Sequence, residues 1–360
     1  MTPTTPHPSA SQGPAAPPDA IDDGLVGIAD IRAAAAKLAG ITVRTPLLPF
    51  GRPIDGHPQG HTRIWLKPES LQPIGAFKLR GAYHALASLS AEDRARGVVA
   101  HSSGNHAQGV ARAAKILGIR AVIVMPSDAP AVKLAGVRAD GAEVVRVGPS
   151  SDERVQVSES LARERGLVLI PAYDDPHIIA GQGTCGLEIV EDLEALGYGE
   201  VPFTVLVPIG GGGFASGVAS AVKALRPDSW VFGVEPEMAA DAAESLRVGH
   251  IVRWDAERVG RTAADGMRTS SLGRLTFRHL AARLDGVVTV SEPAIRRAMV
   301  RAGREARLVL EPSGATTLAA SLFELEQLPE DGPVVVILSG GNVDGDRYAE
   351  LLADGIAAGG

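Results

Sequence analysis

The segment Gly75–Gly81 reads GAFKLRG and places a lysine between an aromatic residue and an arginine. A protonated amine is a poor nucleophile, so enzymes that join a lysine to a carbonyl group desolvate the amine or place it near another cation. We expect Phe77 to supply an apolar wall and Arg80 the neighbouring positive charge. Lys78 is therefore the candidate for covalent carbonyl chemistry, although the segment taken alone is more typical of a lysine with a solvated head.

A run of four glycines, Gly210–Gly213, follows the apolar run Thr204–Val207 and precedes the helix-like segment Phe214–Leu225. Glycines let backbone amides converge, and a helix N-terminus favours an anion, so the run is a candidate phosphate site. A flexible strand-to-helix turn is the alternative. This run lacks the Gly-Lys-Ser/Thr ending of a nucleotide P-loop, and it also lacks the dinucleotide glycine spacing with an acidic residue about twenty positions on.

Two further polar loops follow apolar runs. The first, His101–Gly109, contains Ser102, Ser103, Asn105 and His106, whose hydroxyl and amide donors suit a carboxylate at a helix start. His106 alone is more typical of a structural histidine. In the second loop, Leu338–Asp344, Ser339 either donates to a ring nitrogen or caps the next element.

Apolar runs alternate with helix-like segments along the chain, which predicts an α/β fold of two open sheet-and-helix domains with a cleft between them. Runs without polar alternation indicate parallel strands buried on both faces. The predicted strands are Val98–Ala100, Ala121–Met125, Glu143–Val147, Thr204–Val207 and Val334–Leu338. The predicted helices are Asn105–Leu117, Ala129–Ala139, Glu153–Arg165 and Phe214–Leu225.

Composition excludes several function classes. The 360 residues carry a net charge of −7 spread along the chain, which predicts no nucleic-acid partner. No run reaches the ~20 apolar residues that cross a bilayer, and we expect no signal peptide, because the first residues lack a basic start and an apolar run. Cys185 is the single cysteine, which fits a reducing cytoplasm. Residues 1–24 form a Pro/Ala-rich segment that we expect to be a disordered tail.

Taken together and in order, these loops resemble the fold type II pyridoxal phosphate enzymes (tryptophan synthase β-like), specifically the serine/threonine dehydratase and serine racemase branch. The resemblance covers about residues 25 to 350. Its motifs, read from this sequence, are Lys67–Gln72, Phe77-Lys78, Ser102–Gly109, Met125-Pro126, Ala180–Thr184, Gly210–Gly213, Gly233–Pro236, Glu311–Gly314 and Ser339–Asp344.

The resemblance implies the roles of the cofactor-binding residues. Lys78 would hold pyridoxal 5'-phosphate through a Schiff base, with Phe77 packed beside it. Asn105 would contact the 3-oxygen of the ring, and Ser339 the pyridine nitrogen. The glycines Gly210, Gly211, Gly212 and Gly213 would bind the phosphate.

The implied reaction is β-elimination from a β-hydroxy amino acid, with L-threonine or L-serine preferred, giving a 2-oxo acid and ammonia. The freed amine of Lys78 takes the Cα proton while the cofactor ring accepts charge. Ser103 is either a second acid/base, as in racemase-like members, or a ligand of the substrate carboxylate. Serine racemase activity is therefore an alternative to elimination.

Two positions bear on the choice of substrate. Arg154 falls where a racemase-type arginine reaches a second carboxylate, which allows 3-hydroxyaspartate dehydratase or racemase activity; a helix-surface arginine is the other interpretation. Thr269 is expected near the substrate carboxylate. The chain also has Ile74–Ala76 where the family commonly has Thr-Gly-Ser, which leaves room for bulkier substrates.

The same branch suggests a divalent-cation site. Glu235, the carbonyl of Ala239 and Asp241 supply oxygen ligands of the kind that Mg²⁺ or Ca²⁺ prefers. Surface carboxylates without a metal are the alternative.

We expect residues 25–96 and 173–355 to form a large cofactor-binding domain and residues 97–172 a small mobile domain. About 16 residues follow Asp344, so we expect no regulatory domain, and the family resemblance predicts a homodimer. Two other functions stay open, a β-replacement enzyme and a noncatalytic cofactor-binding protein.

Overall fold

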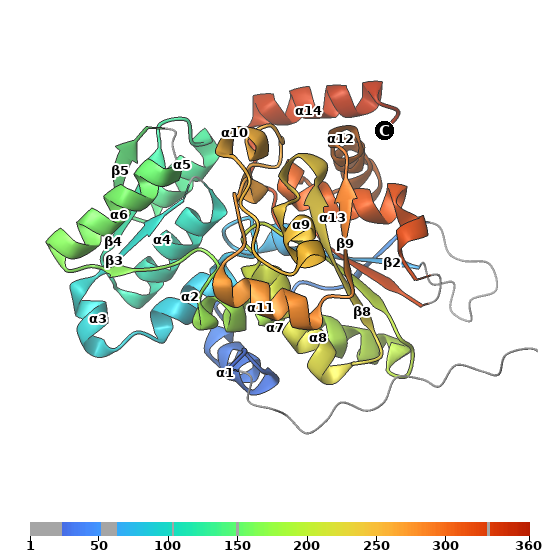
Figure 1. Cartoon of the computed structure of the whole chain (residues 1–360), viewed down its shortest axis with the longest axis horizontal. Helices are drawn as coiled ribbons and strands as arrows, with labels where there is room; N and C mark the ends of the chain where they lie inside the picture. The colour runs from blue at the N-terminus through green and yellow to red at the C-terminus, as the bar shows by residue number, and fades with distance from the viewer. Residues whose placement is uncertain (1–23, 52–62, 103, 149–150, 330–331) are drawn as a thin grey trace, which may run out of the picture.

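The computed structural model describes residues 24–51, 63–102, 104–148, 151–329 and 332–360 and contains two sheets (Figure 1). The larger has the strand order β1-β2-β10-β7-β8-β9, with β1 and β2 antiparallel and the other neighbours parallel. Its strands are β1 (Leu48–Phe50), β2 (Ile64–Lys67), β7 (Thr204–Pro208), β8 (Trp230–Pro236), β9 (Gly286–Val290) and β10 (Val334–Ile337).

Helices cover both faces of the larger sheet because successive side chains of its strands point to opposite faces. Val205 and Val207 pack on the side of α7 and α8, whereas Leu206 packs on the side of α12 and α13. The helices around this sheet are α1 (Ile28–Leu38), α7 (Pro176–Leu193), α8 (Gly213–Leu225), α9 (Asp241–Val248), α10 (Ala256–Val259), α11 (Arg274–Arg283), α12 (Glu292–Arg301), α13 (Pro312–Phe323) and α14 (Gly345–Ala357).

The smaller sheet lies at the left of Figure 1 and is parallel throughout, in the order β5-β4-β3-β6. Ile123 on β4 packs toward α2 and α4, and its neighbour Val122 packs toward α6. The elements here are α2 (Leu79–Ala87), α3 (Ala91–Arg96), β3 (Val98–His101), α4 (Asn105–Leu117), β4 (Ala121–Pro126), α5 (Ala131–Ala139), β5 (Glu143–Val147), α6 (Ser151–Arg165) and β6 (Val168–Leu169).

All nine elements predicted from the sequence are confirmed, each within two residues at either end. Glu143–Val147 and Asn105–Leu117 have the predicted bounds. The parallel pairing predicted for the apolar strands is also confirmed. The predicted tail, apart from Gly24, and Ser103 lie outside the described residues.

The strand ends determine where the polar loops meet. β3 and β6 are parallel neighbours in the smaller sheet, and β7 and β10 are parallel neighbours in the larger one. In each sheet the loops after the two strands therefore lie at the same edge, where ligands of open α/β sheets bind. These loops carry Ser102, Tyr173, Gly210 and Ser339. Within the described part of the chain, helices long and apolar enough to span a membrane are absent.

Candidate active site

A cavity of about 520 Å³ lies where these loops meet. It is lined from β3 and α4, from the loops after β6, β7 and β10, and from the segment 265–271. Twelve of the predicted cofactor- and substrate-contacting residues line it together: Phe77, Lys78, Ser102, Asn105, His106, Arg154, Gly210–Gly213, Thr269 and Ser339. Segments far apart in the sequence therefore form one site.

Lys78 lies immediately before α2, and its amine points into this cavity. The Nζ atom donates to the carbonyl oxygen of Ala172 at 3.0 Å and lies 5.2 Å from the ring centre of Phe77. That ring stacks on Phe214, with 3.9 Å between centroids and 8° between planes. Burial lowers the pKa of Lys78 from 10.5 to about 8. At neutral pH a usable fraction of this amine is therefore unprotonated.

Arg80 does not supply the charge that lowers the pKa of Lys78, which corrects the prediction. Its guanidinium turns away from the cavity and pairs with Glu69 and Glu188, at 2.7 and 2.6 Å. Two carboxylates neutralise it, and burial is the cause of the Lys78 shift. The apolar wall predicted for Phe77 is present, whereas the neighbouring cation is paired elsewhere.

The glycine run forms a tight turn between β7 and α8. Gly212 has φ of +93°, and α8 begins at Gly213, so the amides of its first turn face the cavity end of the helix. A Cβ on Gly211 would lie 2.2 Å from the ring of Tyr173, and one on Gly213 would lie 2.8 Å from its carbonyl oxygen. Backbone without side chains at a helix N-terminus fits a phosphate group.

Asn105 begins α4 and connects the small sheet to the opposite side of the cleft. Its Oδ1 accepts a hydrogen bond from Asn342 at 2.9 Å, and its Nδ2 donates to Glu311. Glu311 also forms an ion pair with Lys133 of α5 at 2.9 Å, and Lys133 pairs with Asp265 at 2.6 Å. Asn105 is thus held at the cavity wall by contacts to residues more than 200 positions away.

The structure describes the loop predicted to bind a carboxylate, except for Ser103. Ser102 Oγ accepts a hydrogen bond from Gly104 N at 3.1 Å. His106 is almost fully buried, with its Nε2 3.4 Å from the carbonyl oxygen of Ile170, and burial together with Lys78 lowers its pKa to about 3. His106 is therefore neutral and lines the cavity as a structural histidine.

Ser339 follows β10 and is buried at the back of the cavity. Its hydroxyl donates to the carbonyl oxygen of Ser313 at 3.3 Å, and its own carbonyl accepts from Phe77 N at 3.1 Å. Ser339 therefore contributes a neutral hydroxyl, rather than a carboxylate, to the lining of the cavity.

The structure adds residues that the sequence analysis did not identify. A second cavity of about 670 Å³ adjoins the first, and the residues that line both include Arg154, Arg253 and Arg268. Burial lowers the pKa of Arg154, and Asp128 only partly offsets this effect. Arg253 and Arg268 come from irregular segments without periodicity, so only their position in the fold reveals them.

Glu235, Ala239 and Asp241 form a separate buried site at the end of β8 and the start of α9. Glu235 accepts hydrogen bonds from the amides of Ala242 and Ala243 at 3.1 and 2.8 Å, whereas Oδ2 of Asp241 is buried without a hydrogen-bond partner. Burial and then Asp241 raise the pKa of Glu235, and burial raises that of Asp241 to about 7. Two adjacent buried carboxyl groups fit a cation. Clusters of three or more His, Cys, Asp or Glu that could hold a metal are absent from the described residues.

Two curated relatives share much of this sequence. L-threo-3-hydroxyaspartate ammonia-lyase of Saccharomyces cerevisiae is 42% identical over 291 residues, covering 81% of this chain and 86% of that protein. A Pseudomonas enzyme of the same name is 41% identical over 326 residues, covering 90% and 97%.

Two solved structures share the fold. A threonine deaminase from the organism abbreviated T.th. matches with a TM-score of 0.80 at 45% identity, covering 88% of this chain and 99% of that chain. Maize serine racemase matches with a TM-score of 0.81 at 36% identity, covering 92% and 98%. The model of the family described as "Pyridoxal-phosphate dependent enzyme" matches residues 38–340, and the chain therefore belongs to the pyridoxal phosphate-dependent enzymes, with the fold predicted from its motifs.

Proposed function

We propose that this protein is an ammonia-lyase that eliminates water from a β-hydroxy amino acid. Water then hydrolyses the resulting imine, which gives a 2-oxo acid and ammonia. The observation that carries the proposal is the desolvated amine of Lys78 in the wall of a cavity that the glycine turn 210–213 also lines. Pyridoxal phosphate fits this arrangement, because the turn and the α8 N-terminus suit its phosphate and Ser339 suits its ring nitrogen. Bound there, it supplies an electron sink for charge at the substrate Cα.

The protein's own groups then have distinct roles. Lys78 Nζ takes the Cα proton, for which a base with a pKa of about 8 is well matched near neutral pH. Phe77 and Phe214 exclude water from one side of the amine. Ser102, Asn105 and the amides that begin α4 bind the substrate carboxylate, and Thr269 lines the same cavity.

L-Threonine and L-serine are the proposed substrates, and the relatives include enzymes named for threonine. A second candidate is 3-hydroxyaspartate, because Arg154, Arg253 and Arg268 surround the junction of the two cavities. An anionic side chain at this junction would be attracted to these three guanidinium groups. Serine racemase activity, with Ser103 as a second base, stays an alternative.

The substrate is tested by assaying 2-oxo acid release and residual amino-acid chirality with L-threonine, L-serine, D-serine and L-threo-3-hydroxyaspartate. Release of a 2-oxo acid from threonine or serine supports the proposal, and no turnover of any of the four amino acids refutes it. Arg154→Gln and Arg253→Gln are then compared with wild type. A loss of roughly tenfold or more in kcat/KM for 3-hydroxyaspartate, with serine turnover unchanged, identifies the dicarboxylate as substrate. Equal losses on both substrates exclude it.

We also propose a Mg²⁺ or Ca²⁺ ion between Glu235, the carbonyl of Ala239 and Asp241. The buried, unpaired Oδ2 of Asp241 supports this proposal, since a cation would compensate both carboxylates. The ion would support the fold rather than the reaction, because these residues belong to a site apart from the cavity.

The proposed setting is the cytoplasm, with the protein a homodimer. Residues 25–96 and 173–355 would form the large domain and residues 97–172 a small domain that moves to close the cavity. Asn105 and Lys133, which contact Glu311 from the small sheet, are consistent with closure.

A further inference from the structure

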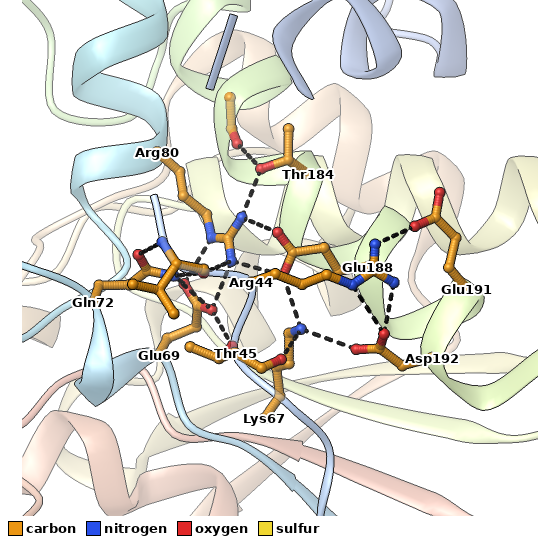
Figure 2. A network of polar contacts seen from close by, with 12 residues as sticks. Arg44, Thr45, Lys67, Glu69, Gln72, Arg80, Thr184, Glu188, Glu191 and Asp192 are labelled. Carbon is orange, nitrogen blue, oxygen red and sulfur yellow. Dashed lines mark hydrogen bonds and ion pairs between the residues drawn. The ribbon is translucent and has the colours of Figure 1, made fainter. Parts of the chain in front are cut away.

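Arg80 follows Lys78 by two residues, is fully buried and belongs to a polar network (Figure 2). The network brings together four segments of the chain: residues 43–45, the end of β2 with the turn that follows, the first turn of α2, and α7. Its members besides Arg80 include Arg44, Thr45, Lys67, Glu69, Gln72, Thr184, Glu188, Glu191 and Asp192.

The guanidinium of Arg80 contacts two carboxylates, each through two nitrogens. Its Nε and Nη2 atoms donate to Glu69 at 2.7 and 2.9 Å, and its Nη1 and Nη2 atoms donate to Glu188 at 2.6 and 2.8 Å. Nη1 also donates to Thr184 Oγ1 at 3.1 Å. Because the planar guanidinium is bound by a carboxylate on each of two edges, both its position and its orientation are fixed. A lysine ammonium cannot form such bidentate contacts.

Stability does not account for an arginine at this place. Burying an ion pair costs desolvation that apolar residues of the same volume avoid. The first turn of a helix also disfavours a cation, because the helix dipole is positive there. Glu69 stays ionised because Arg80 and Lys67 outweigh the effect of burial and lower its pKa. The ion pairs of Arg80 therefore fix the position of the surrounding backbone more than they increase the free energy of unfolding.

The fixed turn is the one that carries Lys78. On its N-terminal side, Phe77 N donates to Ser339 O at 3.1 Å, and Gly341 N donates to Gly75 O at 2.9 Å. On its C-terminal side the first side chain that reaches into the network is Arg80. We propose that Arg80 is a positioning residue whose two bidentate contacts fix the first turn of α2 and hold the Lys78 amine inside the cavity, where it captures the cofactor.

The test uses the full-length apoenzyme and the rate at which its absorbance changes on mixing with pyridoxal phosphate, measured from pH 6.5 to 10. Arg80→Lys keeps the charge and loses the fork. We expect the amine to reach water, so that the pH midpoint of capture rises by about one unit and the rate at pH 7 falls about tenfold. His106 faces Lys78 from α4, but it stays neutral over this pH range, so the midpoint reports the titration of Lys78.

A matched control is Arg112→Lys in α4, where Arg112 Nε lies 2.9 Å from both carboxylate oxygens of Asp140. This variant keeps the wild-type rate and midpoint. If Arg80→Lys lowers the melting temperature but keeps both values as well, Arg80 is merely structural and the inference is wrong.

Two further variants test the inference if Arg80→Lys does not fold and test the role of Lys78 by itself. Thr184→Ala removes one hydrogen-bond acceptor of Arg80, and we expect cofactor capture at pH 7 to slow roughly two- to threefold. If Arg80→Lys does not fold, a wild-type rate of capture in Thr184→Ala overturns the inference. The inference rests on the proposed role of Lys78. Capture that persists in Lys78→Ala refutes that role separately, whatever Arg80→Lys does.

Discussion

Lys78 and Lys133 are both lysines of the cleft, but their surroundings are opposite in charge. Lys133 is almost fully buried between Asp265 and Glu311, at 2.6 and 2.9 Å, and these carboxylates outweigh burial and raise its pKa. Lys78 donates to a backbone carbonyl beside an aromatic ring, and burial lowers its pKa to about 8. The comparison shows that a countercharge decides whether a buried lysine is a fixed cation or a reactive amine.

The largest expected effect comes from removing the countercharged lysine. Lys133→Ala leaves the carboxylates of Asp265 and Glu311 without their cation, so we expect the free energy of unfolding to fall by about 3–5 kcal/mol. Lys115→Ala is the control, because Lys115 pairs with Asp140 but is more than half exposed, and we expect a loss below about 1 kcal/mol. Urea unfolding of both apoenzymes measures the difference. Equal losses would mean that the Lys133 pairs do not act as a buried ion pair.

The second prediction concerns carboxylates that lack a countercharge. The pKa of Asp241 is raised to about 7, so without a cation this group costs stability increasingly as pH rises from about 4 to 7. Mg²⁺ or Ca²⁺ at about 100 times its Kd should add ~3 kcal/mol at pH 8, and less at pH 6, where a proton must leave first. Asp241→Asn should abolish the response, and Asp228→Asn, at a carboxylate that is about half exposed, should keep it. An unchanged melting curve with EDTA and with either metal contradicts the site.

The smallest expected effect is the pH-dependent cost of burying Lys78. Its folded pKa of about 8 lies below the ordinary value of 10.5, so the folded protein binds fewer protons between these values and stability rises with pH across them. Lys78→Met should stabilise the apoenzyme at pH 7 by on the order of 1–2 kcal/mol, since partial exposure screens the charge, and this advantage should vanish by about pH 10.5. The measurement is the difference in unfolding free energy at each pH. A difference that stays constant would show that Lys78 is not desolvated.

Much of the fold could be predicted because glycine and proline punctuate the chain and apolar runs mark the central strands. The glycine run correctly gave both the end of β7 and the start of α8. Strands β1 and β6 have three and two residues, too short for periodicity to show. The local sequence therefore predicts an element when the element is long enough for its own residues to show a pattern.

The motifs predict which residues line the cavity, but they do not predict which charged side chains pair with one another. Lys78 and the glycines lie together as expected, whereas the partners of Arg80 are 11 and 108 positions away and gave no local signal. The sequence predicts that Arg80 acts on Lys78 through its charge because the two residues are close in the chain, but their side chains point in different directions. Their different orientations follow from tertiary packing between α2 and α7. Arg253 and Arg268 were missed for the same reason.

The most direct test of the account is to identify the lysine that joins the cofactor. The protein is loaded with pyridoxal phosphate, reduced with borohydride, digested and mapped by mass spectrometry, with Lys78→Ala treated in parallel. The account predicts one stoichiometric pyridoxyl modification, at Lys78, which disappears in the variant. Modification of Lys67 or Lys133 in its place, or an unchanged map in Lys78→Ala, would contradict the claim that the amine without a countercharge is the reactive one.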